Sequence, residues 1–353
     1  MNKTKWMMVA FLALAVTALS FGLVALFRQS SVQALGPSVP QVIALLPENA
    51  NFVAFVDIRK ILYSPVYKTF ENEHGDKFTS ELQEFIRLTG MDPRNDLESI
   101  AFASFPGPEG SGNVPVAVIS GRFNKEKINA LITSKVNPDI SQYKGITLYS
   151  KRETVTPNEK GSGTEVVGFL DDTKMLFGKR AAIEAVVDAT KGERAGVVAN
   201  PAFVRLLNQT STDGTFWVVG TDVNFLNRFR PQPSKEAKGK APSQSIFPSV
   251  PPIENFIIHG DLGSMISLTL RTECSNEKSA QNVNDFLRGI IALGKLTLEQ
   301  RPEMAGILGD IQVQMDKKLV SLTIQMPFED LKKLHELKKG AETAAPLQSK
   351  EKL

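Results

Sequence analysis

The sequence is poor in the residue types that build metal and redox sites. Its 353 residues include one cysteine and three histidines. A single cysteine excludes a disulfide framework and any zinc site based on cysteine. His74, His259 and His335 do not share the spacing of a metal-binding pair, and His335 lacks the second histidine of a zinc-protease helix. The residue pattern therefore assigns no metal site, no cofactor and no catalytic residue.

The chain also carries little net charge, with 41 Lys and Arg against 38 Asp and Glu. Lys3, Lys5 and Arg28 precede every acidic residue, and without them the two signs are equal at 38 each. Nucleic-acid binding needs a basic surface on the folded part of a protein. We therefore expect no nucleic-acid partner.

The short motifs of common enzyme classes are missing or incomplete. Neither a Gly-x-Ser-x-Gly nucleophile turn nor a phosphate-binding P-loop occurs. Ser141 with Lys144, and Ser275 with Lys278, match the Ser-x-x-Lys of penicillin-interacting enzymes, but the companion motifs are absent. A loop at Ser141 and a helix start at Ser275 explain both matches.

Three other residue types have a structural and a functional interpretation. Asp171 and Asp172 could hold a cation or act as an acid–base pair, but adjacent carboxylates at this position are typical of a hairpin turn. Cys274 shares the strand parity of an apolar face, and Trp217 lies inside an apolar strand. We expect both to be core residues.

Residues 6–27 contain no charged side chain. As a helix they would extend about 33 Å, enough for the hydrocarbon core of a bilayer. Basic residues before this run favour a cytoplasmic N-terminus. We expect residues 1–27 to be a cytoplasmic stub with a transmembrane anchor, which makes the bilayer a partner of residues 6–27. The alternative is a signal peptide cleaved near Ala34, and both alternatives place the body outside the cytoplasm, on the periplasmic side in a Gram-negative cell.

The remaining chain divides into four parts by composition. Residues 28–45 are expected to be a tether, and residues 340–353 a disordered tail. Two α+β repeats are expected at 46–212 and 213–339, the second with a mobile loop at 230–252 that is rich in proline. Lys235, Lys238 and Lys240 in that loop could contact anionic lipid, although a solubilising role is the simpler interpretation.

The repeat is predicted from a recurring order of elements. The apolar run at 216–219 resembles that at 52–56, and the segments 253–261 and 266–274 resemble 97–105 and 116–121. We predict an α+β fold, a tandem duplication of one β/α unit. Its antiparallel sheets would be covered by helices on one face and preceded by one N-terminal transmembrane helix. The alternative is that any two α+β halves look alike under so coarse a pattern.

Local patterns carry a resemblance to uncharacterised exported proteins of the bacterial envelope. The segment 46–57 joins Leu-Pro and small residues to an apolar strand that ends in Asp, and Ser64-Pro65 follows it. Tyr143-Lys144-Gly145-Ile146 and Asn200-Pro201-Ala202-Phe203 are similar in style. The resemblance implies a bacterial exported protein and carries over no functional residue.

These patterns favour a membrane-anchored extracytoplasmic protein that binds or organises other components of the cell envelope, with a possible protein partner there. Two alternatives stay open. One is an envelope hydrolase with a site at the seam between the repeats, which would require convergent carboxylates or a His–carboxylate pair. The other is a carrier of an apolar ligand, suggested by 21 phenylalanines.

Overall fold

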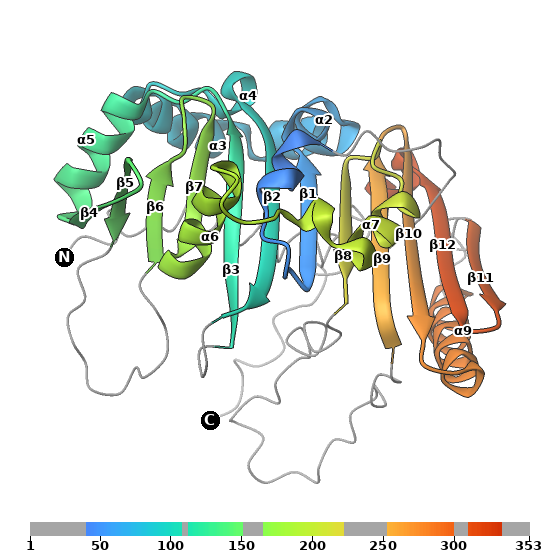
Figure 1. The fold of residues 1–353 in the computed structure, drawn as a ribbon. Helices are drawn as coiled ribbons and strands as arrows, with labels where there is room; N and C mark the ends of the chain where they lie inside the picture. The colour runs from blue at the N-terminus through green and yellow to red at the C-terminus, as the bar shows by residue number, and fades with distance from the viewer. Residues whose placement is uncertain (1–39, 108–111, 151–164, 222–252, 300–309, 334–353) are drawn as a thin grey trace, which may run out of the picture.

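The computed structural model describes residues 40–107, 112–150, 165–221, 253–299 and 310–333 (Figure 1). The predicted anchor at 1–27, loop at 230–252 and tail at 340–353 lie outside these residues, as do His335 and the three lysines of the loop. Among the described helices, none combines the length and the apolar character needed to span a membrane.

The described strands form one antiparallel sheet of 12 strands. Their order across the sheet is β11-β12-β10-β9-β8-β1-β2-β3-β7-β6-β5-β4 (Figure 1). The strand bounds are β1 Phe52–Asp57, β2 Leu97–Pro106, β3 Asn113–Gly121, β4 Asp139–Tyr143, β5 Ile146–Ser150, β6 Glu165–Phe169, β7 Lys174–Lys179, β8 Phe216–Gly220, β9 Ile253–Leu262, β10 Met265–Cys274, β11 Asp310–Asp316 and β12 Leu319–Pro327.

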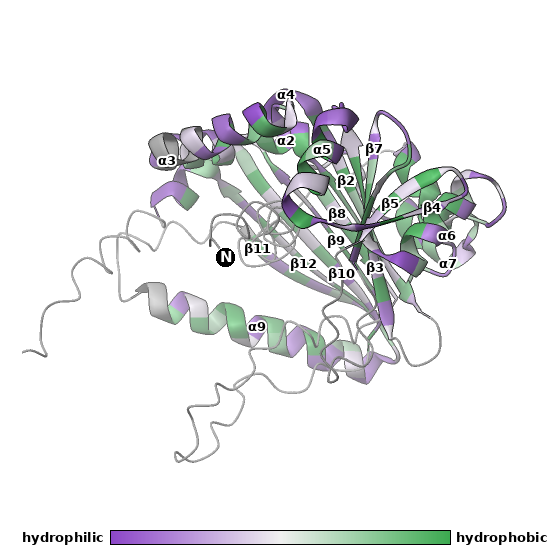
Figure 2. Cartoon of the chain, turned by 90° about the vertical axis from the view of Figure 1, so that its left-hand side faces the viewer, coloured by the Kyte–Doolittle hydropathy of each residue, from purple (hydrophilic) through white to green (hydrophobic). Residues whose placement is uncertain are grey.

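Helices lie on both faces and along one end of this sheet (Figures 1 and 2). Their bounds are η1 Gln41–Leu45, α2 Ile58–Tyr63, α3 Pro65–Thr89, α4 Pro93–Asp96, α5 Lys125–Val136, α6 Arg180–Thr190, η2 Val197–Ala199, α7 Pro201–Asn208 and α9 Glu277–Glu299. In Figure 2, α6 and α7 lie on one side of the sheet, and α3 and α9 lie on the other.

The predicted fold class was wrong. We expected two repeats whose antiparallel sheets are covered by helices on one face. The structure instead has a single continuous antiparallel sheet with helices on both faces. The predicted boundary at residue 213 lies within this one sheet, immediately before β8.

The continuity comes from a pairing between two strands far apart in the sequence. β1 pairs antiparallel with β8, with Phe55 opposite Trp217 and Val53 opposite Val219. Moving outward from this pair, β2-β3-β7-β6 on one side has its counterpart in β9-β10-β12-β11 on the other. Pairing satisfies the backbone donors and acceptors that two open edges would leave exposed. The pattern of side chains along a strand does not record which strand lies beside it.

Short-range interactions of single residues set several helix ends. Ser64 accepts a hydrogen bond from the amide of Tyr67 at 3.1 Å and starts α3 at Pro65. α3 ends at Gly90, whose φ of 68° is the left-handed conformation that glycine adopts most easily. Asn200 caps α7, with its side chain accepting from the amide of Ala202 at 3.0 Å.

The main core lies between the sheet and the layer formed by η1, α6, η2 and α7. Ile43, Ile183 and Phe203 from this layer are almost fully buried together with Val116 and Trp217 from the sheet. Because η1 contributes to this core, residues 41–45 are part of the fold. The predicted tether at 28–45 therefore overlaps the fold by its last residues.

Candidate functional site

The two faces of the sheet differ in their chemistry. We call the face that packs against α6 and α7 face A; it carries Val53, Phe55 and Trp217. The opposite face, which carries Phe52, Ala54 and Val218, we call face B. Residues alternate between the two faces along every strand, so the strand register shows which side chains share a face.

A row of apolar side chains crosses face B from one edge of the sheet to the other. Direct cross-strand partners in this row come from all 12 strands: Ile140, Tyr149, Val167, Phe177, Ala117, Phe102, Ala54, Val218, Ile258, Leu270, Leu322 and Val313. With strands about 4.8 Å apart, the row is about 50 Å long. Only Ala117 is buried; Ile140 is exposed, and the other side chains of the row are partly exposed.

The corresponding row on face A changes character where its helices end. It is apolar from Leu148 to Trp217, beneath α6 and the segments around it. Beyond Trp217 it continues into His259 and then into polar residues, namely Thr269, Thr323 and Gln312. Face A is therefore apolar where helices cover it and polar beyond them, whereas face B stays apolar across its whole width.

Helix α9 covers only one corner of face B. Cys274, Ala280 and Val320 form a small buried core there, with Val283 and Leu287 packed against it. Toward the middle of the sheet, two phenylalanine rings lie against glycines. A methyl group at Gly220 would lie 2.4 Å from the ring of Phe256, and one at Gly260 would lie 2.6 Å from that of Phe216. Both rings are almost fully buried and extend the apolar packing of face B toward the middle of the sheet.

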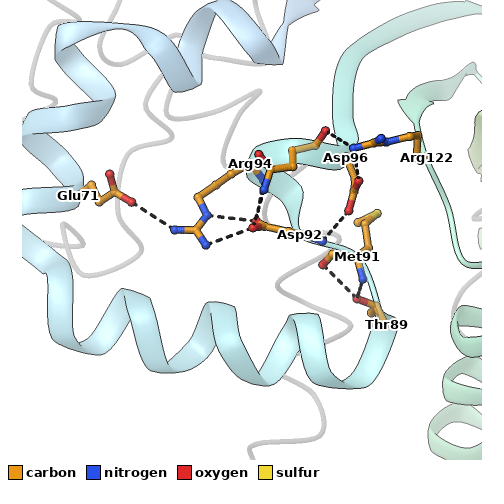
Figure 3. Close-up of polar contacts among 8 residues, drawn as sticks. Glu71, Thr89, Met91, Asp92, Arg94, Asp96 and Arg122 are labelled. Carbon is orange, nitrogen blue, oxygen red and sulfur yellow. Dashed lines mark hydrogen bonds and ion pairs between the residues drawn. The ribbon is translucent and has the colours of Figure 1, made fainter.

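Helices α3 and α9 lie on the same side of the sheet, at opposite borders of face B (Figure 2). A polar cluster fixes the turn that ends α3 (Figure 3). Asp92 accepts hydrogen bonds from the amide and the Nε of Arg94 at 3.0 and 3.1 Å. Arg94 also approaches Glu71 of α3 at 3.8 Å. Burial alone would raise the pKa of Asp92, but the hydrogen bonds from Arg94 outweigh it and lower that pKa.

A second contact ties this turn to the sheet. The carboxylate of Asp96 accepts a hydrogen bond from the amide of Asp92 at 2.8 Å and pairs with Arg122, which follows β3, at 2.9 Å (Figure 3). The position of α3 relative to face B is therefore set by a short network of carboxylates and arginines.

A hollow of about 310 Å³ lies beside α2, at one end of the β1–β8 pair. Its lining includes Asp57, Lys60 and Asp261. Asp57 accepts a hydrogen bond from the amide of Lys60 at 3.0 Å, and Asp261 accepts one from the hydroxyl of Thr215 at 2.6 Å. Both carboxylates thus have a structural role in holding the chain.

The seam predicted to hold a hydrolase site is the β1–β8 pair itself. Between Phe52 and Val56, where β1 pairs with β8, it is apolar on both faces. Phe55 stacks on Trp217 on face A with ring centroids 5.8 Å apart, and Ala54 lies opposite Val218 on face B. These side chains offer neither the convergent carboxylates nor the His–carboxylate pair that the hydrolase hypothesis requires.

The two Ser-x-x-Lys matches do not form catalytic pairs. Ser141 lies in β4, not in a loop as expected, and contacts Arg180, while Lys144 pairs with Asp188 and Glu193. The start of α9 is capped by Asn276, which accepts from the amide of Ser279 at 2.8 Å, so Ser275 precedes the cap.

The remaining sequence candidates have structural roles. Asp171 accepts bonds from Thr173 at 2.7 Å in the β6–β7 turn, and Asp172 pairs with Lys125 at 2.5 Å. The prediction that Cys274 and Trp217 are core residues is confirmed, since both are fully buried. Among the described residues, no group of three His, Cys, Asp or Glu side chains is arranged to hold a metal ion.

His259 is a buried histidine on face A, directly opposite Trp217. Burial, with a smaller effect from Arg271, lowers its pKa from 6.5 to about 4. Neither its Nδ1 nor the Nε1 of Trp217 has a hydrogen-bond partner among the described residues. His259 is therefore a neutral residue of the core, and its imidazole is not exposed as an acid or a base.

Comparison with known proteins gives little. No protein-family model matches this sequence, and no curated protein matches it. Two solved structures of TP0453 show weak similarity to this chain. Crystal form I has a TM-score of 0.43 at 9% identity, over 84% of this chain and 97% of the other. Crystal form III has a TM-score of 0.46 at 10% identity, over 85% and 99%. Similarity this low carries no argument about function.

Proposed function

We propose that this protein is a binding protein of the cell envelope, and that face B is the surface that holds its ligand, an apolar chain of a lipid. The observation that supports the proposal is the 12-strand apolar row, in which all side chains but Ala117 keep some exposure. Its placement outside the cytoplasm rests on the sequence of residues 1–34 alone and stays a prediction.

The contrast between the faces is the main argument. Exposed apolar area in contact with water costs about 25 cal/mol per Å². Face A avoids that cost by carrying Thr323 and the exposed Gln312 where its helices end. Face B carries Leu322 and Val313 on the same strands. A large exposed apolar patch is typical of a surface that meets another apolar body.

The chemistry of the row favours an acyl chain over an extended peptide. An extended peptide binds by adding backbone hydrogen bonds to a free sheet edge. The row crosses strands such as β1 and β8, which have a neighbour on each side. Their backbone groups are already paired and offer nothing to a peptide. A hydrocarbon chain has no polar groups to satisfy, so it loses nothing on entering this surface.

The test uses a 16-carbon fatty acid that carries a photoactivatable diazirine. The full-length protein is irradiated with this probe, and the labelled residues are identified by peptide mass spectrometry. We expect labels on face B residues of the central strands, such as Ala54, Ile258 and Leu270. Labels spread equally over Thr323 and Gln312 on face A would contradict the proposal.

Variants that exchange apolar and hydroxyl side chains provide the matched control. Val218→Thr with Ile258→Thr places two hydroxyl groups on face B, and we expect about tenfold less labelling at equal probe concentration. Thr269→Val with Thr323→Val makes the opposite change on face A and should leave labelling unchanged. If a photoreactive residue at Leu270 captured a protein, or residues 1–39 of this chain, in place of the fatty acid, the lipid proposal would fail.

A further inference from the structure

Arg288 of α9 lies where the apolar row of face B ends at one edge of the sheet. Its Nη2 donates to the carbonyl oxygen of Val313, the β11 member of the row, at 2.9 Å. The next member of the row is Leu322, which lies directly opposite Val313 in β12 and is partly exposed. Figure 1 shows β11 at this edge of the sheet, beside α9. Arg288 therefore places a positive charge at one end of the row.

Hydrogen bonds hold this guanidinium in a fixed position. Its Nε donates to the side-chain oxygen of Asn284, one turn earlier in α9, at 3.1 Å. Asn284 is buried and donates in turn to Asp285 at 3.1 Å. A guanidinium has five N–H donors. The Nε donor and one donor of Nη2 are engaged, so both donors of Nη1 and the second donor of Nη2 remain for a ligand.

The charge of Arg288 forms no ion pair within the part of the chain that the structure describes. Its hydrogen bonds there go to Asn284 and to the backbone of Val313. Asp285 is the acidic residue nearest to it in sequence, and it accepts from Gln281 at 2.7 Å and from Asn284. The side chain of Arg288 is exposed, so an anion from the solvent has access to its remaining donors.

We propose that Arg288 binds the carboxylate of a fatty acid whose hydrocarbon chain lies along the row, from Leu322 toward Val218. A carboxylate has two acceptor oxygens in one plane, which match parallel N–H donors on Nη1 and Nη2. The inference rests on the proposed function. It adds the head group of the ligand, a carboxylate, and the direction in which the chain lies on face B.

The test compares a 16-carbon fatty acid with its methyl ester, which has the same chain and no charge. Both carry a photoactivatable diazirine and are crosslinked to the full-length protein. Arg288→Gln removes the charge and keeps an N–H donor for Val313. We expect about tenfold less labelling of this variant by the acid and unchanged labelling by the ester.

Two further variants are matched to Arg288→Gln. Arg288→Lys keeps the charge and should retain part of the labelling by the acid. Lys278→Gln removes an exposed charge at the start of the same helix and should change labelling by neither compound. An equal loss of acid labelling in Lys278→Gln, an equal loss with acid and ester in Arg288→Gln, or no loss in Arg288→Gln would overturn the inference.

The position of the diazirine gives a second readout, which a purely structural role of Arg288 would not affect. With the diazirine beside the carboxylate, we expect labels on Leu322 and Leu270; with it at the methyl end, we expect labels on Ile258 and Val218. In Arg288→Gln this preference should be lost. The same labels from both probes in the unmodified protein would contradict the proposed direction.

Failure of this inference is distinguishable from failure of the proposed function. Labelling of face B by the ester, together with unchanged acid labelling in Arg288→Gln, would refute the role of Arg288 alone. If neither compound labelled face B, the proposed function itself would fail.

Discussion

His259 is the one histidine whose side chain the structure describes, and its environment has a consequence for stability. It is buried on face A beside Trp217, and burial lowers its pKa from 6.5 to about 4. Between these two pH values the unfolded chain binds a proton that the folded chain does not. Stability from this group is therefore complete above about pH 6.5 and is lost as the pH falls toward 4.

We expect acidification from pH 7 to pH 4 to cost up to about 3 kcal/mol through His259. In His259→Phe this component is absent, so its free energy of unfolding should fall less over the same range. Urea unfolding at a series of pH values measures the difference. Equal pH dependence of the two proteins would show that His259 titrates normally in the folded state.

Glycines provide a second test of local packing. A methyl group at Gly220 would lie 2.4 Å from the ring of Phe256, a buried residue that cannot move freely. We expect Gly220→Ala to destabilise the protein by about 1–3 kcal/mol. Gly289 in α9 has open space around it, and Gly289→Ala should stabilise the protein by up to about 1 kcal/mol. Thermal unfolding of the two variants measures both changes in stability. A loss of stability in Gly289→Ala would contradict the second expectation.

The turn between α3 and α4 depends on one carboxylate. Asp92 starts α4 and accepts hydrogen bonds from Arg94 and from Asn95 at 3.0 Å. We expect Asp92→Ala to cost about 1 kcal/mol and to speed hydrogen exchange in the last turns of α3. Asp330→Ala, which removes an exposed pair with Lys333, is the control and should change neither measurement. Unchanged exchange in α3 would show that the cluster does not hold this helix.

The helices of this protein were easier to predict than its sheet. Ser64-Pro65, Gly90 and Asn200-Pro201 act within a few residues of themselves, so their sequence suffices to place a helix end. The pairing of β1 with β8 joins residues about 165 positions apart, through backbone groups that are the same in every residue. The short strand β4 escaped prediction for a different reason: its residues are mostly exposed, so it lacks the apolar alternation that predicts a strand.

The candidate site was only partly visible in the sequence. Ile311, Val313 and Met315 alternate with glutamines, which indicates a strand with one apolar face. In β1 and β3 both faces are apolar. The sequence shows these apolar patterns strand by strand, but only the strand order shows that the apolar sides meet as one surface. The phenylalanines suggested an apolar ligand, and the structure supplies the row on which that proposal now rests.

One continuous sheet has consequences for how the whole molecule unfolds. The main core includes Trp217, Val219 and Ile257 from the second half of the chain, packed with Val53 and Phe55 from the first. The boundary predicted at residue 213 therefore does not separate two cores. We expect one cooperative unfolding transition for the described body, with no step in which one half unfolds first.

Trp217→Ala tests this expectation, because it removes a fully buried side chain that stacks on Phe55 at the join of the two halves. We expect a loss of about 3–5 kcal/mol and a single transition at lower denaturant. Hydrogen exchange under native conditions should show β3 and β10 losing protection by the same amount, although they lie on opposite sides of the join. Leu319→Ala, at an exposed position at the start of β12, is the control and should shift neither strand. If Trp217→Ala lowered protection in β10 and left β3 unchanged, the two halves would be separate folding units.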